Sequence, residues 1–104
     1  MLRSMITAAL GGFALLFILA GGASAETKTF NNPMQGGNRL DWCYNWGTGC
    51  GSQAATAWCK ANGYSGGATA FHIANDIGAS HPTRLISNGA VCDQGFCDGF
   101  ADIT

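Results

Sequence analysis

The sequence predicts an α+β fold, a small disulfide-stapled domain in which one short helix packs on a small antiparallel sheet. Three observations lead to this prediction. Residues 39–46 alternate with the period of a β-strand. Residues 52–62 are alanine-rich and give the one good helix signal. Five cysteines follow residue 42 in a chain of 104 residues, and a domain this small usually needs cross-links because its core is modest.

The first 25 residues have the composition of a secretory signal peptide. Arg3 supplies the positive start, residues 5–19 are almost wholly apolar, and residues 23–25, Ala-Ser-Ala, match the cleavage pattern of signal peptidase. A retained membrane anchor is the alternative, because residues 5–25 are about long enough to span a bilayer. The glycine pairs and the Ala-Ser-Ala site favour removal. We therefore predict a secreted protein, extracellular or periplasmic, with no membrane span after cleavage.

The predicted mature chain, residues 26–104, carries four cations and six anions, a net charge near −2. Its cations are too few and too scattered to follow a phosphate backbone, so we expect no nucleic-acid partner. Residues 26–38, "ETKTFNNPMQGGN", are polar and turn-rich, and we predict a weakly ordered leader there. A single cysteine-rich domain, residues 39–104, follows.

Three large aromatic rings alternate along the strand predicted at residues 39–46. Alternate residues of a strand share a face, which places Trp42, Tyr44 and Trp46 together. Each ring buries about 150–250 Å², so the core is the favoured location, and an exposed sugar-stacking surface is the alternative. We expect Trp46 to be the exposed ring because it adjoins the tight connection at residues 47–51.

The helix is expected over residues 52–62. Ser52 is the predicted N-cap, since its hydroxyl can accept a hydrogen bond from the free first-turn amides. Gly63 stands where a left-handed residue ends a helix, and Tyr64 is placed for the hydrophobic contact that accompanies this ending. Cys59 lies on the apolar side of the helix, and we expect it to staple the helix to the sheet.

Short strands are predicted in three later segments, "ATAFHIAND", "TRLIS" and "AVC". The segments "GASHPT" and "NGA" are expected to be a loop and a turn, because they combine glycine, asparagine and proline. The last of these strands leads into a final loop, and no element is assigned to the residues that follow it.

The cysteines are predicted to form a disulfide framework. They are Cys43, Cys50, Cys59, Cys92 and Cys97. Export brings a chain to an oxidising compartment, where each disulfide contributes about 2–4 kcal/mol. An odd number leaves one thiol over, and the roughly fifteen ways of forming two bridges stay open. We expect a sixth cysteine after Thr104, so that the domain is truncated at its C-terminus.

The mature chain resembles a type of small secreted six-cysteine domain with no assigned activity. The resemblance is carried by "RLDWC", "WGTGCG", "AATAWCKANGY", "PTRLI", "VC" and "CDGFADIT". It covers nearly all of residues 39–104 and implies a further cysteine just after Thr104.

A more remote resemblance is to the scavenger receptor cysteine-rich domain. It is carried by residues 46–50, 59–64 and 97–99. The family consists of extracellular binding modules with a curled sheet over one helix, and some of its members bind divalent cations. Only eight residues separate Cys50 from Cys59, fewer than the family has. What the resemblance implies for this chain is a secreted binding module.

We therefore predict a secreted, non-catalytic module that binds an extracellular glycan or protein surface. The predicted binding residues are Trp46, Asp93, Phe96 and Asp98, because they lie in glycine-rich, cysteine-flanked loops. A small secreted antimicrobial or toxin-like effector is the alternative, although such proteins are often cationic. No nucleophile elbow or pair of facing carboxylates suggests an enzyme.

No metal site or cofactor is predicted. The residues considered as ligands are Asp93, Asp98, Asp102, His72 and His81. The three aspartates fall within ten residues beside glycines, but their spacing matches no calcium-binding loop. The two histidines lack a third ligand of clear spacing for zinc, and we expect His72 at a half-exposed strand position and His81 exposed in a loop.

Overall fold

The computed structural model describes residues 26–104, and the predicted signal peptide, residues 1–25, lies outside this part. The helix is α3 (Ser52–Ala61). The strands are β1 (Phe30–Asn31), β2 (Met34–Gln35), β3 (Asn38–Leu40), β4 (Cys43–Asn45), β5 (Thr48–Cys50), β6 (Phe71–Ala74), β7 (Thr83–Arg84), β8 (Val91–Cys92) and β9 (Gly99–Ile103). The predicted α+β class is confirmed.

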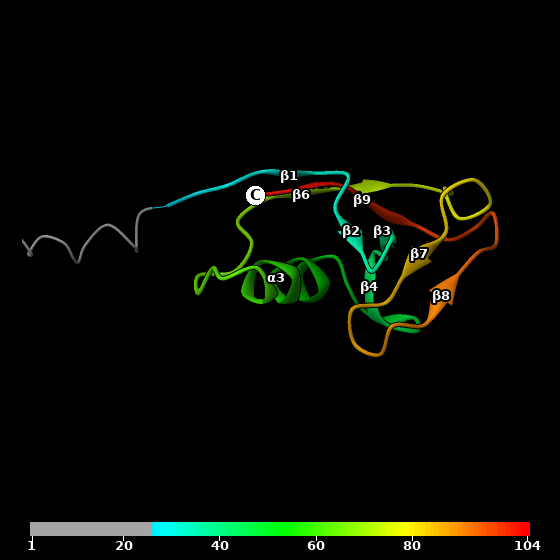
Figure 1. Cartoon of the computed structure of the whole chain (residues 1–104), viewed down its shortest axis with the longest axis horizontal. Coiled ribbons are helices and arrows are strands. Elements are labelled where there is room, and N and C mark those ends of the chain that lie inside the picture. Colours follow the sequence, from blue (N-terminus) through cyan, green and yellow to red (C-terminus); the bar gives the residue numbers. More distant parts are fainter. Residues whose placement is uncertain (1–25) are drawn as a thin grey trace, which may run out of the picture.

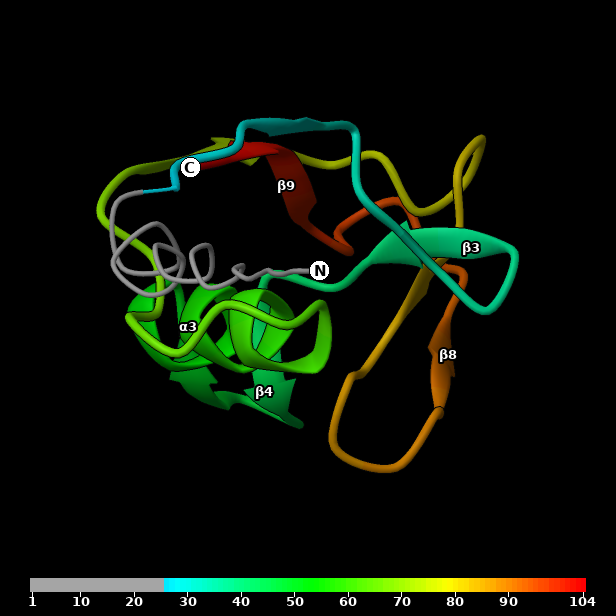
Figure 2. The ribbon, with the colours of Figure 1, turned by 60° about the vertical axis from the view of Figure 1, so that its left-hand side comes forward.

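The strands form three small sheets, where one sheet was expected. Their strand orders are β1-β9-β6, β2-β3-β7-β8 and β4-β5. All strand pairs are antiparallel except β3 with β7, which is parallel. Figure 1 shows α3 on one side of the molecule and the sheet β1-β9-β6 on the other, and Figure 2 shows the same layers from a second direction.

The segment near the C-terminus is the central strand of the first sheet. On one edge β9 pairs with β1, where Ile103 lies opposite Phe30, and on the other edge it pairs with β6, where Ile103 lies opposite Phe71. The sequence signal for this strand was weak because glycine and aspartate are poor strand formers. Pairing with two distant segments therefore decides its conformation.

The prediction of a weakly ordered leader at residues 26–38 is wrong from residue 30 onward, where β1, β2 and the first residue of β3 lie. The Phe30 ring packs edge-on against Trp58, with centroids 5.6 Å apart, and against Tyr64 at 6.1 Å. Gly36 and Gly37 have φ of 57° and 89° and form the two-residue turn between β2 and β3. Two successive positive φ angles suit a tight hairpin, and glycine adopts them without strain.

The single strand predicted at residues 39–46 is divided in the structure into β3 and β4. The chain bends at Asp41, which forms an isolated antiparallel bridge with Gly99. The bend is held by the Asp41 carboxylate, which accepts hydrogen bonds from the Thr83 hydroxyl and from the Cys43 backbone N–H. The three aromatic rings therefore do not form one stripe.

The helix agrees with the prediction at its end and differs at its start. Gly51 is the N-cap, with no side-chain hydrogen bond to the first turn, so the prediction of Ser52 as the cap is wrong. At the other end Gly63 has φ of 94°, and the Tyr64 N–H donates to the Cys59 carbonyl at 3.0 Å. This left-handed ending is the one that the sequence predicts.

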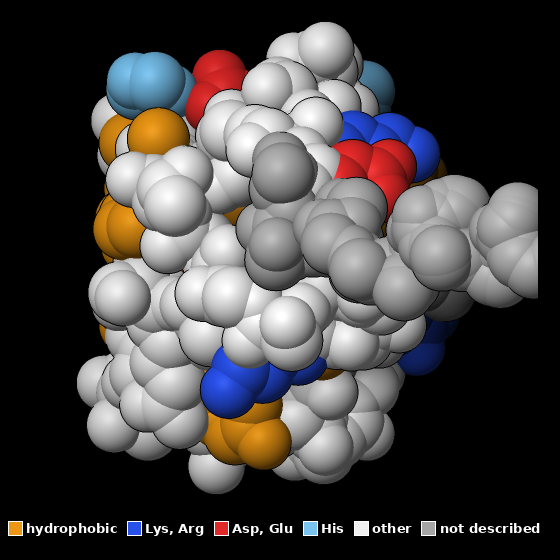
Figure 3. All heavy atoms as spheres, turned by 90° about the vertical axis from the view of Figure 1, so that its left-hand side faces the viewer, with side chains coloured by type: hydrophobic (Ala, Val, Ile, Leu, Met, Phe, Trp, Pro, Cys, Tyr) orange, Lys and Arg blue, Asp and Glu red, His pale blue; other side chains and the backbone are white. Residues whose placement is uncertain are grey.

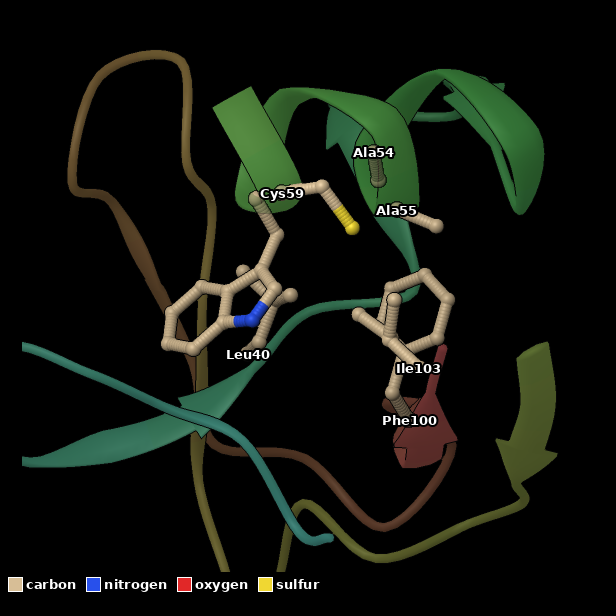
Figure 4. Close-up of a cluster of buried hydrophobic side chains, with 7 residues drawn as sticks. Leu40, Ala54, Ala55, Cys59, Phe100 and Ile103 are labelled. Carbon is tan, nitrogen blue, oxygen red and sulfur yellow. The ribbon is translucent and has the colours of Figure 1, made fainter. Parts of the chain in front are cut away.

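The core lies between α3 and the strands β3 and β9. Its buried members are Leu40, Ala54, Ala55, Trp58, Cys59, Phe100 and Ile103. Figure 4 shows the alanines and Cys59 pointing from the helix toward Phe100 and Ile103. The Trp42 ring packs against this cluster, and its centroid lies 4.8 Å from that of the Phe100 ring. Trp42 and Tyr44 are half-buried and pack against the core, as expected.

Gly78 permits two loops to meet, and its replacement tests that contact. A Cβ atom at Gly78 would overlap the Gln94 carbonyl oxygen and lie 2.5 Å from the Cys97 Cβ. We expect Gly78→Ala to lower the free energy of unfolding by about 1–3 kcal/mol, because the loops must separate. Urea denaturation of Gly95→Ala is the control, since nothing lies within 4 Å of a Cβ there. Equal free energies of unfolding for the two variants would contradict the contact between Gly78 and the loop that carries Gln94 and Cys97.

Candidate functional site

Two disulfides resolve the connectivity that the sequence left open. Cys43 and Cys50 are opposite each other in the β4–β5 hairpin and are bonded. Cys92, at the end of β8, is bonded to Cys97 across a loop of four residues. Both bridges join residues that are close in sequence, seven and five positions apart. Each therefore closes a small surface loop rather than joining the helix to a sheet.

The prediction that Cys59 staples the helix to the sheet is wrong within the described residues. Its thiol is free and buried, with 3% of the residue exposed. Figure 4 shows the sulfur pointing into the core, toward Ile103. Burial raises the pKa of the Cys59 thiol, because the apolar surroundings disfavour the thiolate. Cys59 thus packs as a small apolar residue in this structure.

A cavity of about 560 Å³ lies at the C-terminal end of α3, and both Cys59 and Thr104 line it. The sixth cysteine expected after Thr104 stays a prediction. Figure 3 shows this end of the molecule, on which the charged side chains of the described residues are few and scattered.

Trp46 stands at the tip of the hairpin that the first disulfide closes. Asn45 and Thr48 are paired, which leaves Trp46 and Gly47 as the two turn residues. The Asn45 side-chain oxygen accepts a hydrogen bond from the Trp46 backbone N–H at 2.9 Å. Trp46 is 55% exposed, so its predicted exposure is confirmed.

Phe96 stands in the loop that the second disulfide closes. The Cys97 N–H donates to the Gln94 carbonyl at 3.0 Å, which makes residues 94–97 a hydrogen-bonded β-turn with Phe96 at its third position. The residue is 73% exposed, the highest value among the large apolar residues described as exposed. Asp93, in the same loop, is exposed and accepts a hydrogen bond from the Gln94 side chain at 2.9 Å.

The three aspartates weighed as cation ligands have separate contacts. Asp98 is half-buried, and its carboxylate accepts the Asp76 backbone N–H at 2.8 Å, so it orders a neighbouring turn. Asp102 pairs with the exposed His72 across β6 and β9, at 2.8 Å between carboxylate oxygen and Nδ1. In residues 26–104, no three His, Cys, Asp or Glu side chains are grouped as metal ligands.

The predicted binding residues therefore lie on two separate loops. Figures 1 and 2 show the β4–β5 hairpin and the segment after β8 on different parts of the molecule. Asp93 and Phe96 share the second loop, Asp98 follows it, and Trp46 is on the hairpin.

A second hollow, which sequence reasoning missed, lies between the β2–β3 hairpin and the loop that precedes β7. Arg39 and His81 are among the residues that line it. They are far apart in the sequence, and the parallel pairing of β3 with β7 brings their segments together. No local pattern could have signalled this arrangement.

Comparison with protein-family models, with curated proteins and with solved structures found no match to this chain. Among the described residues, no helix has the length and apolar character that crossing a membrane requires.

Proposed function

We propose that this protein is a secreted, non-catalytic binding module for an extracellular glycan or protein surface. One observation carries the proposal: each of its two disulfides closes a short loop that presents an exposed aromatic ring. Trp46 occupies the Cys43–Cys50 hairpin, and Phe96 occupies the Cys92–Cys97 loop.

The cross-linked loops favour binding for an energetic reason. A free loop loses conformational freedom when it binds, and this loss opposes association. The covalent bridges and the turn hydrogen bonds already restrict both loops. An aromatic ring held in this way contributes a large contact area with few side-chain torsions to fix. The flat face of Trp46 suits the C–H face of a sugar ring, and Phe96 suits an apolar pocket.

Secretion fits the same chemistry. Disulfides form and persist in oxidising compartments, whereas cytosolic thiols are kept reduced. The Cys43–Cys50 pair is partly exposed, whereas Cys92 and Cys97 are buried beneath their loop, and the presence of both bridges supports an extracellular role. The sequence of residues 1–25 supplies the export signal that this role requires.

The rings are tested by Trp46→Ala and Phe96→Ala in the oxidised, secreted protein. We expect at least one variant to lose about tenfold or more in affinity, because exposed aromatic anchors dominate such contacts. The measurement is a screen of wild-type protein against a glycan array and extracellular cell-surface proteins, followed by titration of each hit. Val91→Ala is the matched control, since Val91 is also exposed, at 42%, but lies outside both closed loops.

If the correctly folded wild type bound no glycan and no protein in the two screens, the proposal would be contradicted. Binding that neither aromatic variant weakens would remove these two loops as its site. Hits restricted to the glycan array would assign a sugar ligand, and hits restricted to proteins would assign a protein surface.

A further inference from the structure

The hollow beside the β2–β3 hairpin has an unusual charge character for this chain. Its volume is about 510 Å³, and no aspartate or glutamate is among its lining residues. Arg39 and His81 line it together with three neutral polar residues, Asn32, Asn38 and Ser80. The whole chain has more acidic than basic residues. A concave site lined with donors and without a carboxylate therefore stands out.

Arg39 is fixed in place and keeps unused donors. Its backbone N–H donates to the Pro82 carbonyl at 3.1 Å, and its Nη2 donates to the Phe100 carbonyl at 2.7 Å. Its Nε is buried and has no hydrogen-bond partner among the described residues. Because a guanidinium is a planar cation with several N–H donors, an anion is its natural partner.

No described carboxylate neutralises this cation. The one close contact between a basic and an acidic side chain in residues 26–104 joins His72 to Asp102. Asp41, two positions along the strand from Arg39, is buried and already accepts from the Thr83 hydroxyl and the Cys43 N–H. The positive charge of Arg39 is thus available to a ligand.

The neutral residues suit a ligand that also carries hydroxyl groups. The Asn38 side-chain oxygen accepts from Arg84 Nη2 at 2.7 Å, which leaves the Asn38 amide N–H groups as donors. Asn32 adopts a left-handed backbone, with φ of 49°. Met34, 51% exposed, also lines the hollow and adds an apolar surface. A cation, several amides and one apolar contact are the elements that an acidic sugar requires.

We propose that this hollow binds an acidic sugar, with the sugar carboxylate on Arg39 and His81 and its hydroxyls on the asparagines and Ser80. The inference goes beyond the proposed function, because the hollow is a site distinct from the two aromatic loops.

The test titrates the oxidised, secreted protein with glucuronate, glucose and acetate, and follows backbone amide signals by NMR. We expect glucuronate to shift signals of residues 37–39 and 80–82 and to bind about tenfold or more tightly than glucose, because only glucuronate carries the charge. Equal binding of glucose, or shifts confined to other residues, would overturn the proposal. Acetate binding as tight as that of glucuronate would overturn the assignment to a sugar.

His81→Asp places a negative charge in the hollow. The His81 side chain is exposed, and no hydrogen bond is found for it among the described residues, so the substitution breaks none. We expect glucuronate affinity to fall about tenfold or more, since like charges repel at a binding surface. Ser87→Asp, at an exposed position outside the hollow, is the matched control. Asn32→Gly is a second variant that tolerates the left-handed backbone, and we expect it to weaken glucuronate binding too.

The two proposals fail in different ways. If Trp46→Ala or Phe96→Ala abolishes a glycan-array hit while the wild type ignores glucuronate, only the acidic-sugar site is wrong. If glucuronate binds at the hollow while both aromatic variants bind every hit normally, the proposal of the aromatic loops as a binding site is wrong. The proposal of the acidic-sugar site is then kept. If His81→Asp and Ser87→Asp bind glucuronate equally, the hollow is not the site.

Discussion

Phe100→Ala is expected to lower the free energy of unfolding by about 3–5 kcal/mol, the usual cost of removing a fully buried aromatic ring. Phe100 is 0% exposed and lies on β9, the central strand of its sheet. Its ring contacts the Trp42 and Phe71 rings, at centroid distances of 4.8 and 6.1 Å. The alanine variant would leave a cavity between α3 and the sheet that these rings cannot close.

The expected loss is a large share of the whole stability. A domain of 79 residues is stable by about 4–12 kcal/mol, so we expect this variant to melt at a clearly lower temperature than the wild type. Thermal denaturation followed by near-ultraviolet circular dichroism measures the effect. Phe96→Ala is the matched control, because it removes the same atoms from a residue that is 73% exposed. Similar melting temperatures for the two variants would contradict the described core.

Loss of both disulfides is the second large effect that we expect. Each bridge closes a short loop and limits the unfolded chain, which contributes about 2 kcal/mol for loops of this length. Losing both would remove about 4–5 kcal/mol, comparable to the whole stability of a small domain. Full reduction and alkylation should therefore unfold the protein or lower its melting temperature steeply.

Two double variants separate the contributions of the bridges. Cys43→Ala with Cys50→Ala opens the hairpin, and Cys92→Ala with Cys97→Ala opens the second loop. We expect each to lose about 2 kcal/mol in urea denaturation. Cys59→Ala removes a cysteine without removing a bridge, and we expect a smaller loss that comes from core packing alone, since Cys59 is free and buried. An unchanged melting temperature after complete reduction would contradict the prediction that the disulfides stabilise this small fold.

Local features of the sequence predicted some elements well. The helix at residues 52–62 and its left-handed ending at Gly63 depend on neighbouring residues alone, so they are predictable from the sequence. The exposure of Trp46 was also predictable, because a residue in a glycine-flanked turn has little core to reach. The central role of β9 and the ordering of residues 30–35 were not predictable in this way, since each depends on strands distant in the sequence.

The candidate sites also differ in whether local sequence or contacts between distant segments create them. The sequence marks Trp46 and Phe96 because their cysteine and glycine neighbours indicate constrained loops. It could not mark the hollow of Arg39 and His81, because a parallel strand pair joins their segments only in the folded chain. Nor could it choose among disulfide pairings, which depend on distances between side chains.

The sequence by itself determined the α+β class, the single helix of the described chain and the presence of disulfides, because composition and local periodicity govern these properties. The tertiary structure alone decided which cysteines pair, that Cys59 packs in the core and that Arg39 faces a hollow without a carboxylate. The physical reason is that these last features are contacts between distant segments, and strand pairing with burial sets such contacts only when the chain is folded.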